Sequence, residues 1–185
     1  MKKIYGKCNS SVEKADSFKW RRYNPKTTSG KLCYYICSKE SDLPIRNAPQ
    51  KKEPNYETGT YNCCASCNQR SISSALKRNF SHILFVTRYK GKLKKYRKKC
   101  FIVGFYKIGY TAKVPDKKRI QRDGIKAAQM CFVRIEHGHR LKKVKNLRNA
   151  TQCILKKKLN PILKQLEKHN IVDEYKHEVK RLGDT

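Results

Sequence analysis

Residues 82–89 read His-Ile-Leu-Phe-Val-Thr-Arg-Tyr, and residues 100–110 read Cys-Phe-Ile-Val-Gly-Phe-Tyr-Lys-Ile-Gly-Tyr. Both stretches are rich in β-branched and aromatic residues, which favour strands. Between them, residues 90–99 are mostly lysine and arginine. The three stretches together predict a β-hairpin with a basic tip. Gly104 and Gly109, inside the second strand, predict a bulge or a sharp bend.

The region before the hairpin is rich in cysteine, tyrosine and asparagine and shows little periodicity. Residues 31–37 and 61–64 are short strand candidates, and the proline-containing stretch 40–60 is typical of a long loop. Residues 71–80 have apolar side chains near helical spacing and predict a short helix. A region with so few aliphatic residues needs a metal, or the rest of the protein, to pack on.

The region after the hairpin predicts one more strand and several helices. We expect a short helix over 116–129 and a strand over 131–135. From Leu141 onward, apolar residues recur three and four positions apart, as on one face of an amphipathic helix. Pro161 is expected to break or kink this helix, and a second helix is expected to follow it.

The whole pattern predicts an α+β fold with three portions. Residues 1–70 form a cysteine-rich portion packed on the core, residues 71–140 a β-rich core built as a small β-barrel or sheet, and residues 141–185 basic C-terminal helices. No apolar run approaches the about 20 residues that a membrane-crossing helix needs, so we expect no membrane partner. The first residues lack the apolar core of a signal peptide. We therefore expect a protein that is not secreted and that lies in the cytoplasm, or with the nucleoid or nucleus.

The charge of the chain is large and unevenly placed. Lysine and arginine number 45 against 14 acidic residues, which gives a formal net charge of +31. Acidic residues are absent from Thr58 to Pro115 and again from His137 to Leu166. So large a charge favours an anionic partner, and phosphate contacts supply most of the non-specific affinity of proteins for nucleic acids. We therefore expect RNA or DNA as the partner.

The candidate nucleic-acid contacts lie in the hairpin tip and in the next acid-free stretch, and all but Tyr96 are basic. They are Arg88, Lys90, Lys92, Lys94, Lys95, Tyr96, Arg97, Lys98, Lys99, Lys142, Lys143, Lys145 and Arg148. Aromatic faces stack on unpaired bases, and Trp20 and Tyr89 are the candidates for this contact. The alternative for both aromatic residues is packing inside the protein.

The cysteines gather in the first part of the chain. In a reducing compartment, clustered cysteines favour a metal site over a disulfide framework. Two close pairs predict a structural zinc site with four thiolate ligands, Cys33, Cys37, Cys64 and Cys67. Cys63 can replace Cys64, and Cys8 can replace either member of the first pair. The alternative is that these cysteines are free and buried, and behave as small hydrophobic residues.

The segments ILFVTRY (83–89) and FIVGFYKI (101–108) resemble the strand pattern of PUA-like barrels, the group that includes the EVE, ASCH and YTH domains. The resemblance covers about residues 80–110 and is one of pattern. It implies a small β-barrel with a basic surface. Many members of the group bind RNA or modified bases in DNA, so the resemblance implies a reader of RNA or of modified or flipped bases.

A second resemblance implies an alternative function. Tyr106-Lys-Ile-Gly-Tyr-Thr111 is similar to the second half of the motif of GIY-YIG nucleases, and Arg119 follows eight residues later. The resemblance implies a metal-dependent nuclease acting on DNA, in which Tyr106 helps to activate water and Arg119 stabilises the phosphoryl transition state. The segment expected to carry the metal-binding glutamate, from Asn149, has no acid, which favours binding without catalysis. A third interpretation is a structural protein that sits on the RNA of a ribosome or similar assembly.

Overall fold

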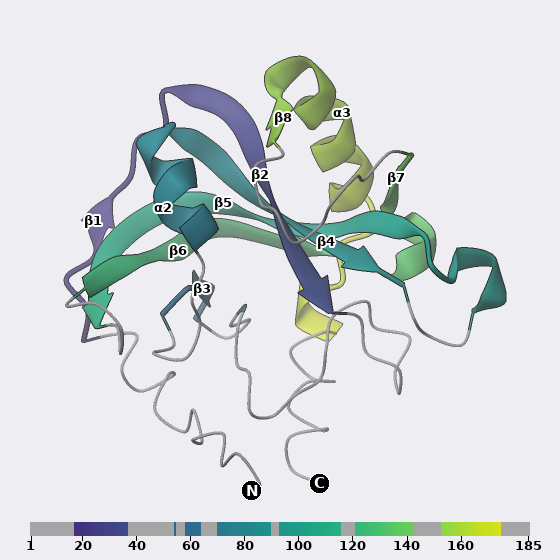
Figure 1. Cartoon of the computed structure of the whole chain (residues 1–185), viewed down its shortest axis with the longest axis horizontal. Coiled ribbons are helices and arrows are strands. Elements are labelled where there is room, and N and C mark those ends of the chain that lie inside the picture. Colours follow the sequence, from purple (N-terminus) through teal and green to yellow (C-terminus); the bar gives the residue numbers. More distant parts are fainter. Residues whose placement is uncertain are drawn as a thin grey trace, which may run out of the picture.

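The computed structural model describes residues 17–36, 54, 58–63, 70–89, 93–115, 121–142 and 153–174, and its centre is a single mixed β-sheet (Figure 1). The strands are β1 (Arg21–Arg22), β2 (Thr27–Ile36), β3 (Thr60–Tyr61), β4 (Phe80–Arg88), β5 (Cys100–Pro115), β6 (Gln121–Phe132), β7 (His139–Leu141) and β8 (Cys153–Leu155). The helices are α2 (Arg70–Lys77) and α3 (Lys156–Glu167), with short 3-10 helices η1 (Lys94–Tyr96) and η2 (Ile135–His137).

The sheet is open. Its strands follow the order β3-β6-β5-β4-β2-β8, and within the described residues the two outermost strands do not pair with each other. β3 has two residues and β8 has three, so these strands offer few backbone groups for closing a barrel. The predicted α+β class is confirmed. The core was predicted to be a small β-barrel or a sheet. The structure has an open sheet, so the prediction of a closed barrel is wrong.

Strand β5 is the longest strand, with 16 residues, and its two edges organise the sheet. One edge pairs with β4 and then with β1, while the other pairs with β7 and then with β6. The antiparallel pairing of β4 with β5 confirms the predicted hairpin. The register shifts beside Gly104 and at Gly109, as the sequence predicted. A Cβ atom at Gly104 would collide with the carbonyl oxygen of Cys131, so this close approach of strands requires glycine.

One helix packs on each face of the sheet (Figure 1). Ile83 and Phe85 point into the apolar cluster that includes α2, whereas Leu84 and Val86 point into the cluster that includes α3. Because both faces of β4 are buried, its centre is continuously apolar and does not alternate with polar residues. The α3 cluster takes its helical side chains from one stripe: Leu159, Ile162, Leu163 and Leu166.

All three predicted portions contribute to this sheet. β2 comes from residues 1–70 and runs parallel to β4, with α2 in the connection between them. β8 comes from residues 141–185 and pairs antiparallel with β2. The helix predicted over 71–80 and the strands predicted over 31–37 and 61–64 are present as α2, β2 and β3, with shifted ends. The predicted loop over 40–60 lies almost entirely outside the described residues.

Several expectations after the hairpin are wrong. Residues 121–132 form β6 where a helix was expected over 116–129, because pairing along β5 outweighs local preference. The strand expected over 131–135 ends at Phe132. The helix expected from Leu141 onward is present in part. Leu141 belongs to β7 and Cys153–Leu155 form β8, whereas residues from Lys156 onward are helical in α3, and residues 143–152 lie outside the described part of the chain.

Helix α3 does not break at Pro161. Proline removes one backbone hydrogen bond, but burial of the apolar stripe against the sheet offsets that loss. None of the helices that the structure describes has both the length and the apolar character needed to cross a membrane.

Candidate nucleic-acid interface

The turn between β4 and β5 is held by a buried tyrosine. The Tyr89 N–H donates to the Lys99 carbonyl, and the Lys98 N–H donates to the Tyr89 carbonyl, each at 2.9 Å. The Tyr96 ring packs edge-on against Tyr89 at 6.2 Å and against Phe101 at 5.7 Å between ring centroids. These contacts fix the backbone of the turn.

The basic side chains of this turn are exposed to solvent. The exposed residues are Lys94, Lys95, Arg97, Lys98 and Lys99. The Lys95 ammonium lies 4.8 Å from the centroid of the Tyr96 ring, within the range of a cation–π contact. The Lys99 ammonium donates a hydrogen bond to the Lys95 carbonyl at 2.6 Å. The turn therefore presents several cations on a backbone that is already ordered.

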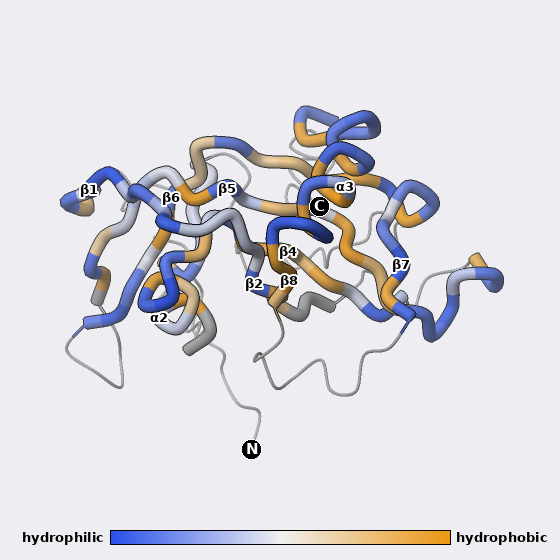
Figure 2. Tube along the Cα trace, turned by 90° about the horizontal axis from the view of Figure 1, so that it is seen from above, coloured by the Kyte–Doolittle hydropathy of each residue, from blue (hydrophilic) through white to orange (hydrophobic). Residues whose placement is uncertain are grey.

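Two further segments bring cations to the same end of the sheet. Arg88 is the exposed last residue of β4 and pairs with Cys100. β7 pairs with the start of β5 and places Arg140 opposite Phe101, and Lys142 follows immediately. We call this group the basic end: Arg88, Lys94, Lys95, Arg97, Lys98, Lys99, Arg140 and Lys142. Figure 1 shows η1 and β7 at one extreme of the sheet, and Figure 2 shows hydrophilic residues along the η1 turn.

Two of the acidic residues that the structure describes form ion pairs with cations outside the basic end. Asp123 contacts Lys113 at 2.6 Å, far along β5 from its first residue. Burial would raise the pKa of Asp123, but hydrogen bonds from Lys113 and Ser73 and the charges of Lys113 and Lys77 together outweigh burial and lower it. Arg134 contacts Glu174 at 3.3 Å. Glu136, in η2, is exposed near β7, and among the described residues this carboxylate is outnumbered by the cations of the basic end.

Helix α3 carries a further group of cations that the sequence analysis did not single out. Lys156, Lys157 and Lys158 are exposed in its first turn, which contains no acid. Cations are unfavourable there, because the helix dipole places about half a positive charge at the N-terminus. The acid-free stretch around these lysines was the feature of the sequence that could have indicated them. Their place in the first turn of a helix follows only from the position at which α3 begins.

The other predicted contacts have different outcomes. Tyr89 is fully buried, so its ring is not available for base stacking in this structure. Trp20 is half-buried, contacts Phe18 edge-on at 6.1 Å and packs against a cluster around Val114. Five predicted basic residues lie outside the described part of the chain: Lys90, Lys92, Lys143, Lys145 and Arg148.

Of the two residues of the nuclease alternative, the structure describes Tyr106. Tyr106 has no exposed surface, and its ring lies 5.0 Å from Phe85 and 5.8 Å from Phe132 between centroids. A substrate phosphate cannot contact a residue in this position without opening of the core. Arg119 lies outside the described residues.

Of the predicted zinc ligands, only Cys33 is described. It is buried inside β2, which continues to Ile36, and three extended residues span about 10 Å. Residues 33–36 are therefore extended, whereas a chelating pair of cysteines is usually presented by a tight turn. Cys64 and Cys67 also lie outside the described residues, and the described ones contain no cluster of three or more potential ligands.

Comparisons of the chain with protein-family models, with curated proteins and with solved structures give no match. The basic end is therefore interpreted from its own chemistry.

Proposed function

We propose that the protein binds the phosphate backbone of a nucleic acid, RNA or DNA, through its basic end. The observation that carries the proposal is the meeting of exposed cations from three segments, the η1 turn, the end of β4 and β7, at one end of the sheet. Arginine binds phosphate oxygens in a bidentate manner, and lysine acts as a point charge. Both residue types are present, so the surface suits a polyphosphate chain.

The ordered turn strengthens this proposal. Tyr89 and Tyr96 fix the η1 backbone before any ligand binds, so binding orders mainly the long basic side chains. Contacts to phosphate carry no base sequence information directly. The basic end therefore supports binding of many sequences, and any base preference would come from another part of the chain.

Binding through the basic end should depend steeply on salt. If about six cations contact phosphates, the affinity for duplex DNA should fall about a thousandfold between about 50 mM and 200 mM salt, because released counterions drive the association. Fluorescence anisotropy with a labelled duplex, repeated across this salt range, measures the slope. Equal affinity at both salt concentrations would contradict phosphate binding.

We also propose a structural zinc site outside the described residues, with Cys8 in the place of Cys33. The ligands would be Cys8, Cys37, Cys64 and Cys67, since the extended conformation of β2 does not suit Cys33 as a chelating partner. Four thiolates would leave no open position for catalysis on the metal.

Elemental analysis of the purified protein is expected to give about one zinc ion per chain. Cys67→Ala should abolish the bound zinc, whereas the matched variant Cys33→Ala should retain it. A metal-free protein that is fully folded, or loss of zinc from Cys33→Ala, would contradict this ligand set.

A further inference from the structure

Tyr110 is an exposed aromatic residue on a sheet whose other large rings are mostly buried. Its exposed fraction is 42%, whereas Tyr61, Tyr89 and Tyr106 are fully buried. It lies on β5, ten residues beyond Cys100, which corresponds to about 33 Å of extended strand. Tyr110 is therefore well separated from the basic end, and a role in that surface does not explain its exposure.

The bulge at Gly109 sets the direction of the Tyr110 side chain. Ile108 points into the apolar cluster on the α2 face, and so does Ile125, the partner of Thr111. Direct cross-strand partners share a face, so Thr111 also points to the α2 face. Tyr110, one residue earlier, consequently points to the opposite face. The extra residue at Gly109 shifts the alternation by one position and turns Tyr110 away from the α2 cluster.

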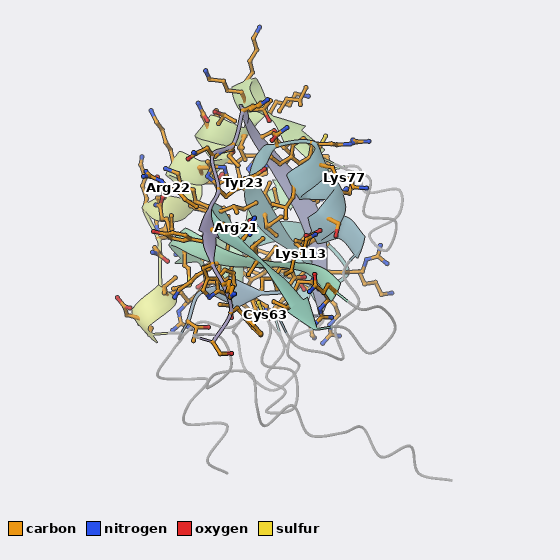
Figure 3. The ribbon with its side chains drawn as sticks, turned by 90° about the vertical axis from the view of Figure 1, so that its left-hand side faces the viewer. Arg21, Arg22, Tyr23, Cys63, Lys77 and Lys113 are labelled. Carbon is orange, nitrogen blue, oxygen red and sulfur yellow. The ribbon has the colours of Figure 1, made fainter. Side chains whose placement is uncertain are left out.

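A cation lies on each side of Tyr110 in the same row of the sheet. Arg22 of β1 is the direct partner of Tyr110 on one edge of β5, and Lys126 of β6 is the direct partner on the other edge. Neighbouring strands lie about 5 Å apart, and direct partners share a face. The row therefore consists of a cation, an aromatic ring and a second cation, side by side on three neighbouring strands. Figure 3 views this end of the sheet and labels Arg22 with its neighbour Arg21 on β1.

Among the described carboxylates, Asp123 lies nearest to Tyr110 along the paired strands, but its side chain does not belong to this row. Asp123 pairs with Lys113, which is two residues from Thr111 and shares its α2 face. Asp123 thus occupies the face opposite to Tyr110. Arg22 is exposed, and among the described residues no carboxylate lies within ion-pair distance of it. The row therefore places the exposed Arg22 and the half-buried Lys126 on either side of a partly exposed ring.

We propose that Arg22, Tyr110 and Lys126 form a binding site for an unpaired nucleotide, in which the base stacks on Tyr110 and the adjoining phosphates contact the two cations. Every base has a flat π-face, so stacking of this kind tolerates any sequence, and a positive groove with aromatic rings is the common device for single-stranded nucleic acids. A paired base in a duplex is already stacked on its neighbours and does not offer its face. The site therefore adds a preference for single strands to the proposed binding of the phosphate backbone. This inference rests on that proposed function.

The test compares single-stranded and duplex probes on the full chain. A fluorescently labelled single strand of about 16 nucleotides and its duplex are titrated by anisotropy against the wild type, Tyr110→Ala and Tyr110→Phe. We expect Tyr110→Ala to weaken single-strand binding about tenfold, since stacking on one aromatic ring contributes on this order. Duplex binding should stay within twofold of the wild type, and Tyr110→Phe, which keeps the ring, should match the wild type on both probes.

A second probe reports stacking itself. A single strand that contains 2-aminopurine loses fluorescence when that base stacks, so the wild type and Tyr110→Phe should quench it and Tyr110→Ala should quench it less. If Tyr110→Ala binds the single strand as tightly as the wild type does, or loses the same affinity for the single strand and for the duplex, the site is overturned but backbone binding is not. Absence of any binding by the wild type overturns the proposed function itself. Tyr110 is exposed, so thermal unfolding of the variants serves as the folding control.

Discussion

Replacing Lys94, Arg97 and Arg140 together with glutamate is expected to weaken binding of duplex DNA at least about a hundredfold at about 50 mM salt. Each change removes one phosphate-binding cation and adds a charge that repels phosphate. The three residues come from the η1 turn and from β7, so the variant tests whether these segments act as one surface. All three side chains are exposed, and surface changes of this kind usually alter stability little.

The salt dependence of this variant gives a sharper measure than its affinity. Each lost phosphate contact lowers the slope of log affinity against log salt by about 0.9, so the slope should fall by about 3. The same anisotropy titration supplies both quantities. A variant that loses affinity with an unchanged slope would contradict phosphate contact by these side chains.

The matched control places the same charge change elsewhere. Lys19→Glu, Lys77→Glu and Arg78→Glu also reverse three exposed cations, and these residues lie in or beside β1 and α2, away from the η1 turn. Both triple variants lower the net charge equally, so long-range attraction is reduced in both. The control should lose much less duplex affinity. Equal losses in the two variants would mean that total charge, and not the basic end, determines binding.

The sequence was informative where local pattern and long-range structure agree. β4 and β5 are apolar, β-branched and close together in the chain, so their pairing needs only a short connection. The basic tip was predictable for the same reason. In contrast, the pairing of β7 with the start of β5 joins residues about 40 positions apart, and no local pattern in residues 139–141 indicates it. That pairing brings Arg140 to the basic end.

The failures have a common physical cause. Residues 121–132 contain alanines, lysine and glutamine, which are good helix formers, but the long edge of β5 recruits them as a strand. The exposure of Tyr110 depends on one extra residue at Gly109, and a shift of one residue moves every later side chain to the other face. The sequence predicted a bulge there, but it did not indicate which tyrosine the bulge would turn outward.

Acidification from pH 7.5 to 5.0 is expected to lower the free energy of unfolding by about 2 kcal/mol through His82 alone. His82 is buried in β4, and its Nδ1 lies 2.7 Å from the Ser81 hydroxyl. Burial, with a smaller contribution from the charge of Lys107, lowers the pKa of His82 to about 4. An exposed histidine in the unfolded chain has a pKa of about 6.5.

Between these two pKa values the unfolded chain binds a proton that the folded protein does not. Stability is therefore complete above about pH 6.5 and decreases as the pH falls, by about 3 kcal/mol in total when the pH reaches about 4. Ending the experiment at pH 5.0 excludes most of the titration of carboxylates such as Asp123, whose pKa is lowered. Urea unfolding at the two pH values measures the difference in the free energy of unfolding.

His82→Gln separates this residue from the other histidines. The variant removes the titrating ring, so its loss of stability between pH 7.5 and 5.0 should be smaller than that of the wild type by about 2 kcal/mol, whatever its stability at pH 7.5. His169→Gln is the matched control. Its ring is exposed and stacks on His137 at 3.8 Å between centroids, outside the buried environment of His82, so it should keep most of the wild-type pH dependence. The same pH dependence in His82→Gln and in the wild type would show that His82 is not buried in its neutral form. In that case the environment of β4, the strand that leads to the basic end, would differ from the one described.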